Sequence, residues 1–199
     1  MPAEAVAGAP PATFHRPGGA WLSGHLFLRG RGHTDEVLAR VVHPFAARCL
    51  ERGLAGGFFF IRYSELGPHL RLRFYGDPAV LEAEVAPGLE EQLRGTLPAA
   101  AAGEPVQEPA AVTRGSGHPS LRWIAYEPEV DRYGGPHALP VAEELFHCSS
   151  QVSIALLGRS PLTDRAVRLG RVLPTLVTLL AAFTGDPAEA AALARLHRD

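Results

Sequence analysis

Lysine is absent from this chain: all 19 basic residues are arginine. The sequence is also rich in alanine, glycine and proline, and together with the missing lysine this is typical of GC-rich coding bias. The number of arginines is therefore no guide to function by itself. The formal net charge is −2, so no overall positive field attracts nucleic acid, and we expect no direct nucleic-acid binding.

Cysteines and long apolar runs are scarce as well. Cys49 and Cys148 have neither metal-ligand spacing nor the pattern of a disulfide framework. The best apolar candidate, residues 172–183, is too short to cross a membrane and contains Pro174. The first residues lack the basic segment and apolar core of a signal peptide. We therefore expect a cytoplasmic protein with no membrane partner, no metal and no cofactor.

The remaining composition fits one sizeable soluble domain, with 46% apolar and 20% charged residues. Residues 1–19 are rich in alanine, proline and glycine and are predicted to be a disordered tail. Residues 20–199 are predicted to form a single domain. Within it, residues 20–136 form an α+β part and residues 137–199 a helical part.

Apolar periodicity and turn signals predict the order of the elements. Strands are expected at 21–29, 57–63, 69–75 and 121–126. The first helix lies between the first two strands and begins at a cap, Thr34 or Asp35. The second begins at Asp77-Pro78, bends near Pro87 and ends near residue 97, before a long loop at 98–119. Further helices are expected at 140–157, at 162–183 and after residue 186.

The order strand, helix, strand, strand, helix, strand is that of the ferredoxin-like split βαβ arrangement. It predicts an α+β fold in which helices cover one face of an antiparallel sheet. A helical C-terminal segment then follows this sheet.

The segment FFFIRYSELGPHLRLRF, residues 58–74, predicts a hairpin turning at Gly67-Pro68. Side chains alternate across a strand, so Leu70, Leu72 and Phe74 share one face. The other face carries His69, Arg71 and Arg73. Arginine presents a planar fork of donors to carboxylates and phosphates, so this face is a candidate anion site. The same pattern also fits the solvated outer face of a one-sided sheet.

A second polar motif is YEPEVDRYGG, residues 126–135. Its two closing glycines permit positive φ angles or a close approach of another chain. One interpretation is a structural corner in which Tyr133 packs and Arg132 pairs with Glu129 or Asp131. The other is that the corner contributes these side chains to a functional site.

Taken together, the HLRLR segment, YEPEVDRYGGP and AEELFHCSS, in this order, resemble the C-terminal domain of lantibiotic dehydratases. The same domain occurs as stand-alone thiopeptide-type bacteriocin biosynthesis proteins. The resemblance implies that the chain removes glutamate by β-elimination from glutamylated Ser or Thr of a ribosomal precursor peptide, leaving dehydroalanine or dehydrobutyrine. That reaction needs a base for the Cα proton and cations for the departing carboxylate.

By motif position the resemblance assigns the glutamate-binding arginines of the family to Arg71, Arg73 and Arg132, with Arg62 as a weaker candidate. His69 is added because it lies on the same strand face as Arg71 and Arg73 and could supply a base or acid. The candidate catalytic residues are Arg71, Arg73, Arg132 and His69. The candidate substrate-binding residues are Arg62, Tyr126, Glu129 and Tyr133. Family elimination domains also place a catalytic histidine in an HMxxNR-like segment, whereas this sequence ends in LHRD with only His197 nearby.

That difference leaves two alternatives beside glutamate elimination. One is a pyridine synthase of a thiopeptide pathway, which joins two dehydroalanines in a formal aza-[4+2] cycloaddition and releases the leader peptide. The other is a non-catalytic module that binds the precursor peptide or a glutamylating dehydratase partner. A homo-oligomer is left open.

Overall fold

A five-stranded antiparallel sheet with the strand order β2-β3-β1-β5-β4 forms the centre of the fold. The strands are β1 (Trp21–Phe27), β2 (Gly57–Tyr63), β3 (His69–Tyr75), β4 (Val112–Arg114) and β5 (Leu121–Ile124). Without β4, the order of the remaining strands is that of the predicted ferredoxin-like sheet, so the predicted α+β fold is confirmed. The prediction missed β4, a short strand inside the segment expected to be a loop.

The computed structural model describes residues 20–110 and 112–158, and the isolated residues 170, 174 and 178. The chain divides into two compact units, residues 1–155 and 156–199, and the following description concerns the first. The predicted tail at 1–19 lies outside the described residues. So do the predicted helices at 162–183 and after 186, apart from the three isolated positions.

Both predicted helices of the α+β part form, and each widens in the middle to a π-type turn. The first comprises α1 (Thr34–Val37), the wide turn η2 (Leu38–Val42) and α2 (His43–Glu51), after a short 3₁₀ turn η1 (Arg31–His33). The second comprises α3 (Pro78–Val80), the wide turn η3 (Leu81–Val85) and α4 (Ala86–Thr96). Each wide turn lies just before a proline, which cannot donate the ordinary helical hydrogen bond and crowds the preceding turn.

The helix ends match the sequence signals in part. Asp77 caps α3 as predicted, because its Oδ1 accepts from the N–H groups of Ala79 and Val80 at 2.9 and 3.1 Å. The predicted cap of the first helix at Thr34 or Asp35 is wrong. His33 occupies the N-cap position there without a side-chain cap.

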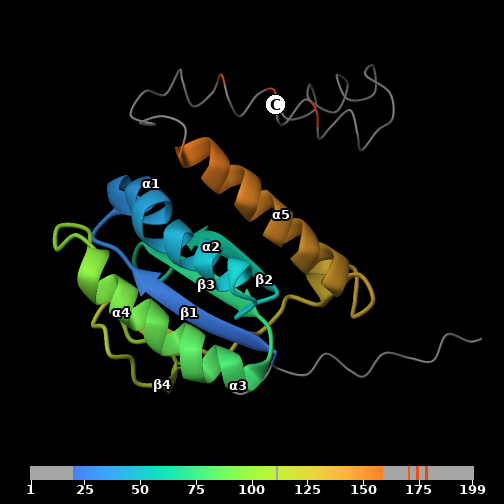
Figure 1. Ribbon diagram of the computed structural model, residues 1–199, viewed down its shortest axis with the longest axis horizontal. Coiled ribbons are helices and arrows are strands. Elements are labelled where there is room, and N and C mark those ends of the chain that lie inside the picture. The colour runs from blue at the N-terminus through green and yellow to red at the C-terminus, as the bar shows by residue number, and fades with distance from the viewer. Residues whose placement is uncertain (1–19, 111, 159–169, 171–173, 175–177, 179–199) are drawn as a thin grey trace, which may run out of the picture. The chain divides into compact units, whose positions relative to one another are not determined.

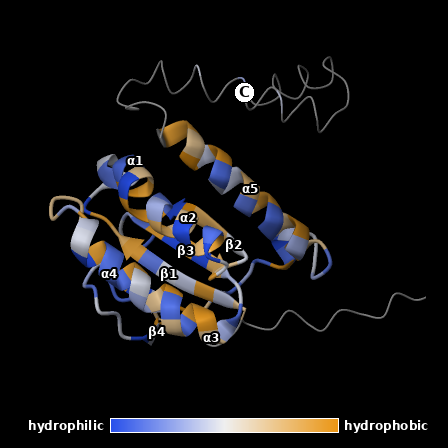
Figure 2. Cartoon of the chain, in the orientation of Figure 1, coloured by the Kyte–Doolittle hydropathy of each residue, from blue (hydrophilic) through white to orange (hydrophobic). Residues whose placement is uncertain are grey.

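The first face of the sheet packs against α1–α4, which lie on one side of it (Figure 1). Leu70, Leu72 and Phe74 of β3 are fully buried on this face, and the ring of Phe74 meets Phe45 of α2 edge-on at 5.9 Å. Hydrophilic and hydrophobic residues alternate along α4, as expected for a helix with one buried side (Figure 2). This face therefore holds the main core.

The second face is partly covered by α5 (Leu139–Gly158). Phe146 of α5 packs against a small cluster of Trp21, Phe59 and Tyr126. Within the ranges described, no helix is long and apolar enough to span a membrane. The rest of the second face carries the polar side chains of β1 and β3.

Candidate functional site

Pairing between strands gathers polar side chains on the second face of the sheet. In register, Arg73 of β3 lies between Ser23 of β1 and Phe59 of β2, and Arg71 lies between His25 and Ile61. Neighbours in register point to the same face. The predicted alternation of the hairpin is therefore confirmed, and β1 adds polar groups that the hairpin alone did not reveal.

Arg73 is a buried cation without a carboxylate partner among the described residues. Its side chain is only 5% exposed. One terminal nitrogen donates to the Leu72 carbonyl at 3.1 Å, and the other lies 3.4 Å from Nε2 of His25. Nε has no hydrogen-bond partner within the described part of the chain. Burial, and then the charge of Arg71, lowers the pKa of Arg73 to about 9. A buried charge without a counter-ion is costly, so this guanidinium gains from an anion that enters the site.

Arg71 lies beside Arg73 but nearer to solvent, with 26% of its side chain exposed. Its guanidinium stacks over the ring of Tyr63 at 3.4 Å from the centroid. Glu65 is 3.8 Å away and 70% exposed, which makes it a weak partner. Arg71 is thus held by an aromatic ring and remains open to a second anion.

Two histidines stack beside the arginines, with the rings of His25 and His69 at 4.9 Å. Nδ1 of His69 lies 2.8 Å from the Gly67 carbonyl, so it carries the proton and donates. Its Nε2 is then free to accept from Nε of Arg71 at 3.5 Å. Burial, and then the charge of Arg73, lowers the pKa of His25 to about 2. Burial also lowers the pKa of His69, so both rings are neutral acceptors toward the guanidiniums.

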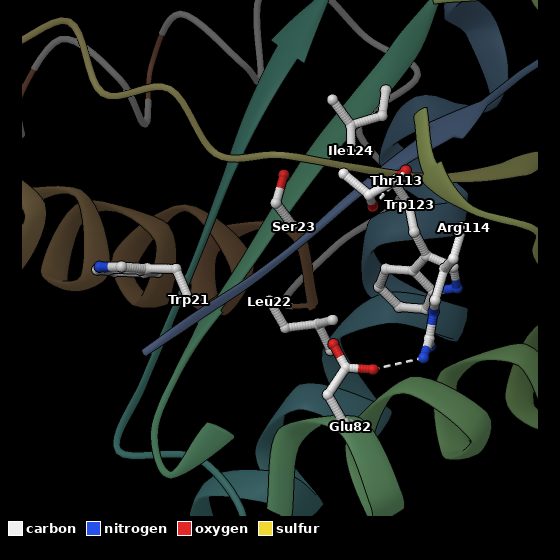
Figure 3. A pocket seen from close by; sticks show the side chains of 8 residues that line it. All are labelled: Trp21, Leu22, Ser23, Glu82, Thr113, Arg114, Trp123 and Ile124. Carbon is white, nitrogen blue, oxygen red and sulfur yellow. Dashed lines mark hydrogen bonds and ion pairs between the residues drawn. The ribbon is translucent and has the colours of Figure 1, made fainter. Parts of the chain in front are cut away.

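Sequence reasoning missed His25 and Ser23. Both are buried, and Ser23 Oγ has no hydrogen-bond partner among the described residues. Ser23 points to the opposite side of β1 from Leu22 (Figure 3). The sequence WLSGHLF shows that Ser23 and His25 fall on the same side of a strand. Their position beside Arg73 and Arg71, however, depends on the long-range pairing of β1 with β3. Ser23 Oγ and Arg73 Nε are therefore donors left without a partner on neighbouring strands.

The pocket in Figure 3 lies at β1, β4 and β5 and shares Ser23 with the polar group around Arg73. An ion pair between Arg114 and Glu82 lines it, and the Arg114 guanidinium lies 5.0 Å from the ring centroid of Trp123. Arg114 therefore has a carboxylate partner, which Arg73 lacks among the described residues, although Nε of Arg114 likewise has no hydrogen-bond partner in that part of the chain.

Tyr126 connects Arg73 to a carboxyl group on α5. The Tyr126 hydroxyl donates to Glu143 at 2.8 Å, and the Arg73 guanidinium lies 5.0 Å from the centre of the Tyr126 ring. Burial raises the pKa of Glu143, and burial together with Glu143 raises the pKa of Tyr126. Tyr126, a predicted substrate-binding residue, therefore lies against the buried cation. Glu143 was not anticipated.

The YEPEVDRYGG corner contains a short 3₁₀ turn, η4 (Asp131–Tyr133), closed by Gly134 at a φ of 84°. Tyr133 packs on Phe146 at 5.1 Å, and Arg132 pairs with Glu129 at 3.0 Å. These contacts are those of the structural interpretation. Phe146 also contacts Phe59 at 5.4 Å, so the corner lies on the Arg73 side of the sheet. In the described part of the chain, Arg132 makes no contact with either strand arginine.

Arg62 does not join the group. It points to the helix-covered side of the sheet, where its guanidinium pairs with Asp35 at 2.6 Å. Within the described ranges, no group of three or more His, Cys, Asp or Glu residues is arranged to hold a metal ion. The candidate site is therefore a cation-rich face formed by Arg71, Arg73, His25, His69 and Ser23, which we call the arginine face.

Comparison with known proteins provides independent information on the chain as a whole. A family model described as "Lantibiotic biosynthesis dehydratase C-term" matches residues 21–198. No curated protein matches the chain. The tRNA-dependent lantibiotic dehydratase MibB from Microbispora sp. 107891 is similar in structure with a TM-score of 0.61 and 27% identity. The match covers 89% of this chain but only 15% of MibB.

Two further solved structures share the fold. TsrL matches with a TM-score of 0.53 and 24% identity, over 79% of this chain and 39% of TsrL. TbtD, a pyridine synthase from thiomuracin biosynthesis, matches with a TM-score of 0.53 and 16% identity. That match covers 90% of this chain and 66% of TbtD. The chain thus spans only a part of each of these proteins.

Proposed function

The chain belongs to the lantibiotic biosynthesis dehydratase C-terminal family, and we propose that it removes glutamate from glutamylated Ser or Thr residues of a ribosomal precursor peptide. The products are a dehydroamino acid in the peptide and free glutamate. The reaction is a β-elimination: a base takes the Cα proton, the electron pair of the Cα–H bond forms the Cα–Cβ double bond, and the Cβ–O bond breaks with its electron pair on the departing oxygen. The departing oxygen becomes part of a carboxylate.

The observation that carries this proposal is the buried guanidinium of Arg73, which has no carboxylate partner among the described residues. Charge that develops on a leaving carboxylate is stabilised best by donors already fixed in a site with little water. Arg73 is such a donor, since Nε lacks a partner and burial removes competing water. Arg71 supplies a second guanidinium nearer to solvent, where it can receive another carboxylate of the glutamyl group.

The remaining residues have supporting roles in this proposal. His25 and His69 hold the two guanidiniums as neutral acceptors, and we assign His69 this role rather than proton removal. Its Nδ1 proton is already bonded to Gly67, and its lowered pKa makes it a weak base. Tyr126 lies over Arg73, and the corner with Glu129, Arg132 and Tyr133 brings a third cation to the same side of the sheet.

A conversion assay tests the function. A synthetic peptide with one glutamylated serine is incubated with the wild type, Arg71→Met, Arg73→Met and Arg40→Met, and the products are read by mass spectrometry. Arg40 is a matched control, because it lies exposed on the first helix and pairs only with Glu36. We expect conversion by the wild type and Arg40→Met, and a loss of about 100-fold or more in the other two variants.

Two results would reject the elimination. In the first, the wild-type protein leaves the glutamylated peptide unchanged, which favours a binding module. The other is a peptide with two dehydroalanines that becomes a heterocycle and loses its leader, which assigns the cycloaddition instead. Equal conversion by all four proteins would show that the arginine face is not the site.

A further inference from the structure

Removal of the Cα proton needs a base, and one carboxyl group lies close to the buried cation. It belongs to Glu143, near the start of α5. Its Oε1 accepts from the Tyr126 hydroxyl at 2.8 Å, and the Arg73 guanidinium lies 5.0 Å from the centre of the Tyr126 ring. The phenol ring therefore stands between the carboxylate and the cation. Within the described residues, Glu143 forms no ion pair, and its Oε2 has no hydrogen-bond partner.

Other carboxylates on this side of the sheet are held by arginines. These pairs are Glu65 with Arg71, Glu129 with Arg132, and Glu108 with Arg122, which is in register with His25. A carboxylate in such a pair has to give up the ion pair when it takes a proton. The donor to Glu143 is instead a neutral hydroxyl. Glu143 can therefore take a proton without breaking an ion pair.

The surroundings of Glu143 also favour proton uptake. Burial raises the pKa of its carboxyl group, and the hydrogen bond from Tyr126 offsets only part of this rise. A carboxylate with a raised pKa is a stronger base near neutral pH. The two histidines of the arginine face differ in this respect, because burial lowers the pKa of both His25 and His69.

Burial decreases from Arg73 to Glu143 in the order that a glutamylated residue requires. Arg73 is 5% exposed and Tyr126 is 7% exposed, whereas Glu143 is only half-buried. In a glutamylated serine the glutamyl group is at the end of the side chain, and Cα is part of the peptide backbone. A glutamyl group that enters toward Arg73 therefore leaves Cα nearer to solvent, at the depth of Glu143. The peptide backbone does not have to pass beneath α5.

We propose that Glu143 is the base that takes the Cα proton of the glutamylated residue; this inference rests on the proposed elimination. Oε2 of the carboxylate binds the proton, while Tyr126 holds Oε1. The electron pair of the Cα–H bond forms the Cα–Cβ double bond. The Cβ–O bond breaks with its electron pair on the glutamate carboxylate, which Arg73 receives. Glu143 then gives the proton to solvent and is ready for the next turnover.

A conversion assay with matched variants tests this assignment. Glu143→Gln keeps an oxygen that can accept from Tyr126 but does not take a proton at neutral pH. Glu144→Gln is the control, because it makes the same change at the next residue of α5, where the side chain is exposed. We expect Glu143→Gln to convert the glutamylated peptide about 100-fold or more slowly than the wild type. Its peptide binding, measured by fluorescence anisotropy, should be unchanged, and Glu144→Gln should convert at the wild-type rate.

Chemical rescue separates a base from a structural carboxylate. Glu143→Ala leaves room for a small carboxylate, so added formate should restore part of the conversion, whereas chloride at the same ionic strength should not. Formate should also fail to restore Arg73→Met, which lacks the cation rather than the base. A folded Glu143→Ala that formate does not rescue would show that the carboxyl group is structural and would overturn the proposal.

Hydrogen exchange in D₂O distinguishes failure of this proposal from failure of the proposed function. An analogue with an amide in place of the glutamyl ester keeps the Cα proton but has a poor leaving group. Exchange of this proton by a wild type that does not convert the ester, lost in Glu143→Gln, supports the base and rejects only the elimination. Equal conversion of the ester by the wild type and Glu143→Gln overturns the base and leaves the elimination standing.

Two further outcomes would also overturn the proposal. Normal conversion by Glu143→Gln together with loss of conversion in His197→Gln would assign proton removal to His197. A wild type that neither converts the ester nor exchanges the Cα proton of the analogue would reject both the base and the elimination.

Discussion

The two faces of the sheet differ although the same strand, β3, forms the middle of both. On the helix-covered face Leu70, Leu72 and Phe74 are fully buried and pack against apolar neighbours. On the arginine face, Arg73 is also buried, but its Nε has no hydrogen-bond partner among the described residues. The first face is stabilised by its own apolar contacts, whereas we propose that the second is stabilised by an anion that binds there. In this proposal, the alternation of side chains along one strand separates stability from ligand binding.

The largest expected effect removes part of the apolar face. Leu72→Ala should lower the free energy of unfolding by about 2–5 kcal/mol, because the side chain is fully buried and its loss leaves a cavity. Urea denaturation measures this change. Glutamate affinity of the folded protein should stay as in the wild type, and a parallel loss of affinity would show that the two faces are not separate.

Arg73→Met acts on the arginine face, so it should lower activity without lowering stability. Conversion of the glutamylated peptide falls about 100-fold, while the free energy of unfolding stays unchanged or rises, because a buried charge without a counter-ion is removed. Denaturation and conversion are measured on the same preparation, with Arg40→Met alongside. A free energy of unfolding that is several kcal/mol lower than in the wild type would mean that Arg73 has a structural role.

The pH dependence of stability tests the neutral state of His25. Its pKa in the folded protein is lowered to about 2, below the ordinary value of 6.5. Between these values the unfolded chain binds a proton that the native state does not, so stability is lost as the pH falls below 6.5. His25→Gln should make this fall shallower by about 1.4 kcal/mol per pH unit.

Denaturation at several pH values between about 4 and 6 measures this slope. Arg40→Met, an exposed substitution away from the arginine face, is the control. Parallel slopes for His25→Gln and the wild type would show that His25 is charged in the folded protein.

The smallest effect on stability is expected at the corner. Arg132 and Glu129 form an exposed ion pair, and such pairs contribute about 0–1 kcal/mol. Arg132→Ala should therefore change the melting behaviour little and yet reduce conversion of the glutamylated peptide, if the corner supplies the third cation. Unchanged conversion would show that Arg132 is not part of the site, which would then contain only Arg71 and Arg73 as cations.

Local patterns were enough to predict the hairpin, whose strands form at 57–63 and 69–75 as expected. Alternation and a Gly-Pro turn depend on neighbours in the sequence. The neighbours of Arg73 could not be predicted in the same way, because His25 and Ser23 lie on β1, which pairs with β3 although the first helix and β2 separate the two strands in the sequence. Arg62 is the opposite case, a residue that was predicted for the site but lies outside it. Its motif position suggested substrate binding, but side chains alternate along β2, so Arg62 lies on the other face and pairs with Asp35. The short strand β4 lacked a pattern long enough to be recognised.

The central claim is that the arginine face binds a carboxylate through Arg73. Nitrogen-15 NMR of arginine-labelled protein tests it directly, with the Arg73 Nε–H signal assigned by its loss in Arg73→Met. Because this group has no partner before the ligand binds, titration with glutamate should shift its signal saturably, and the signal of the exposed Arg40 should not move. An Arg73 signal that stays in place while glutamate binds would contradict the account.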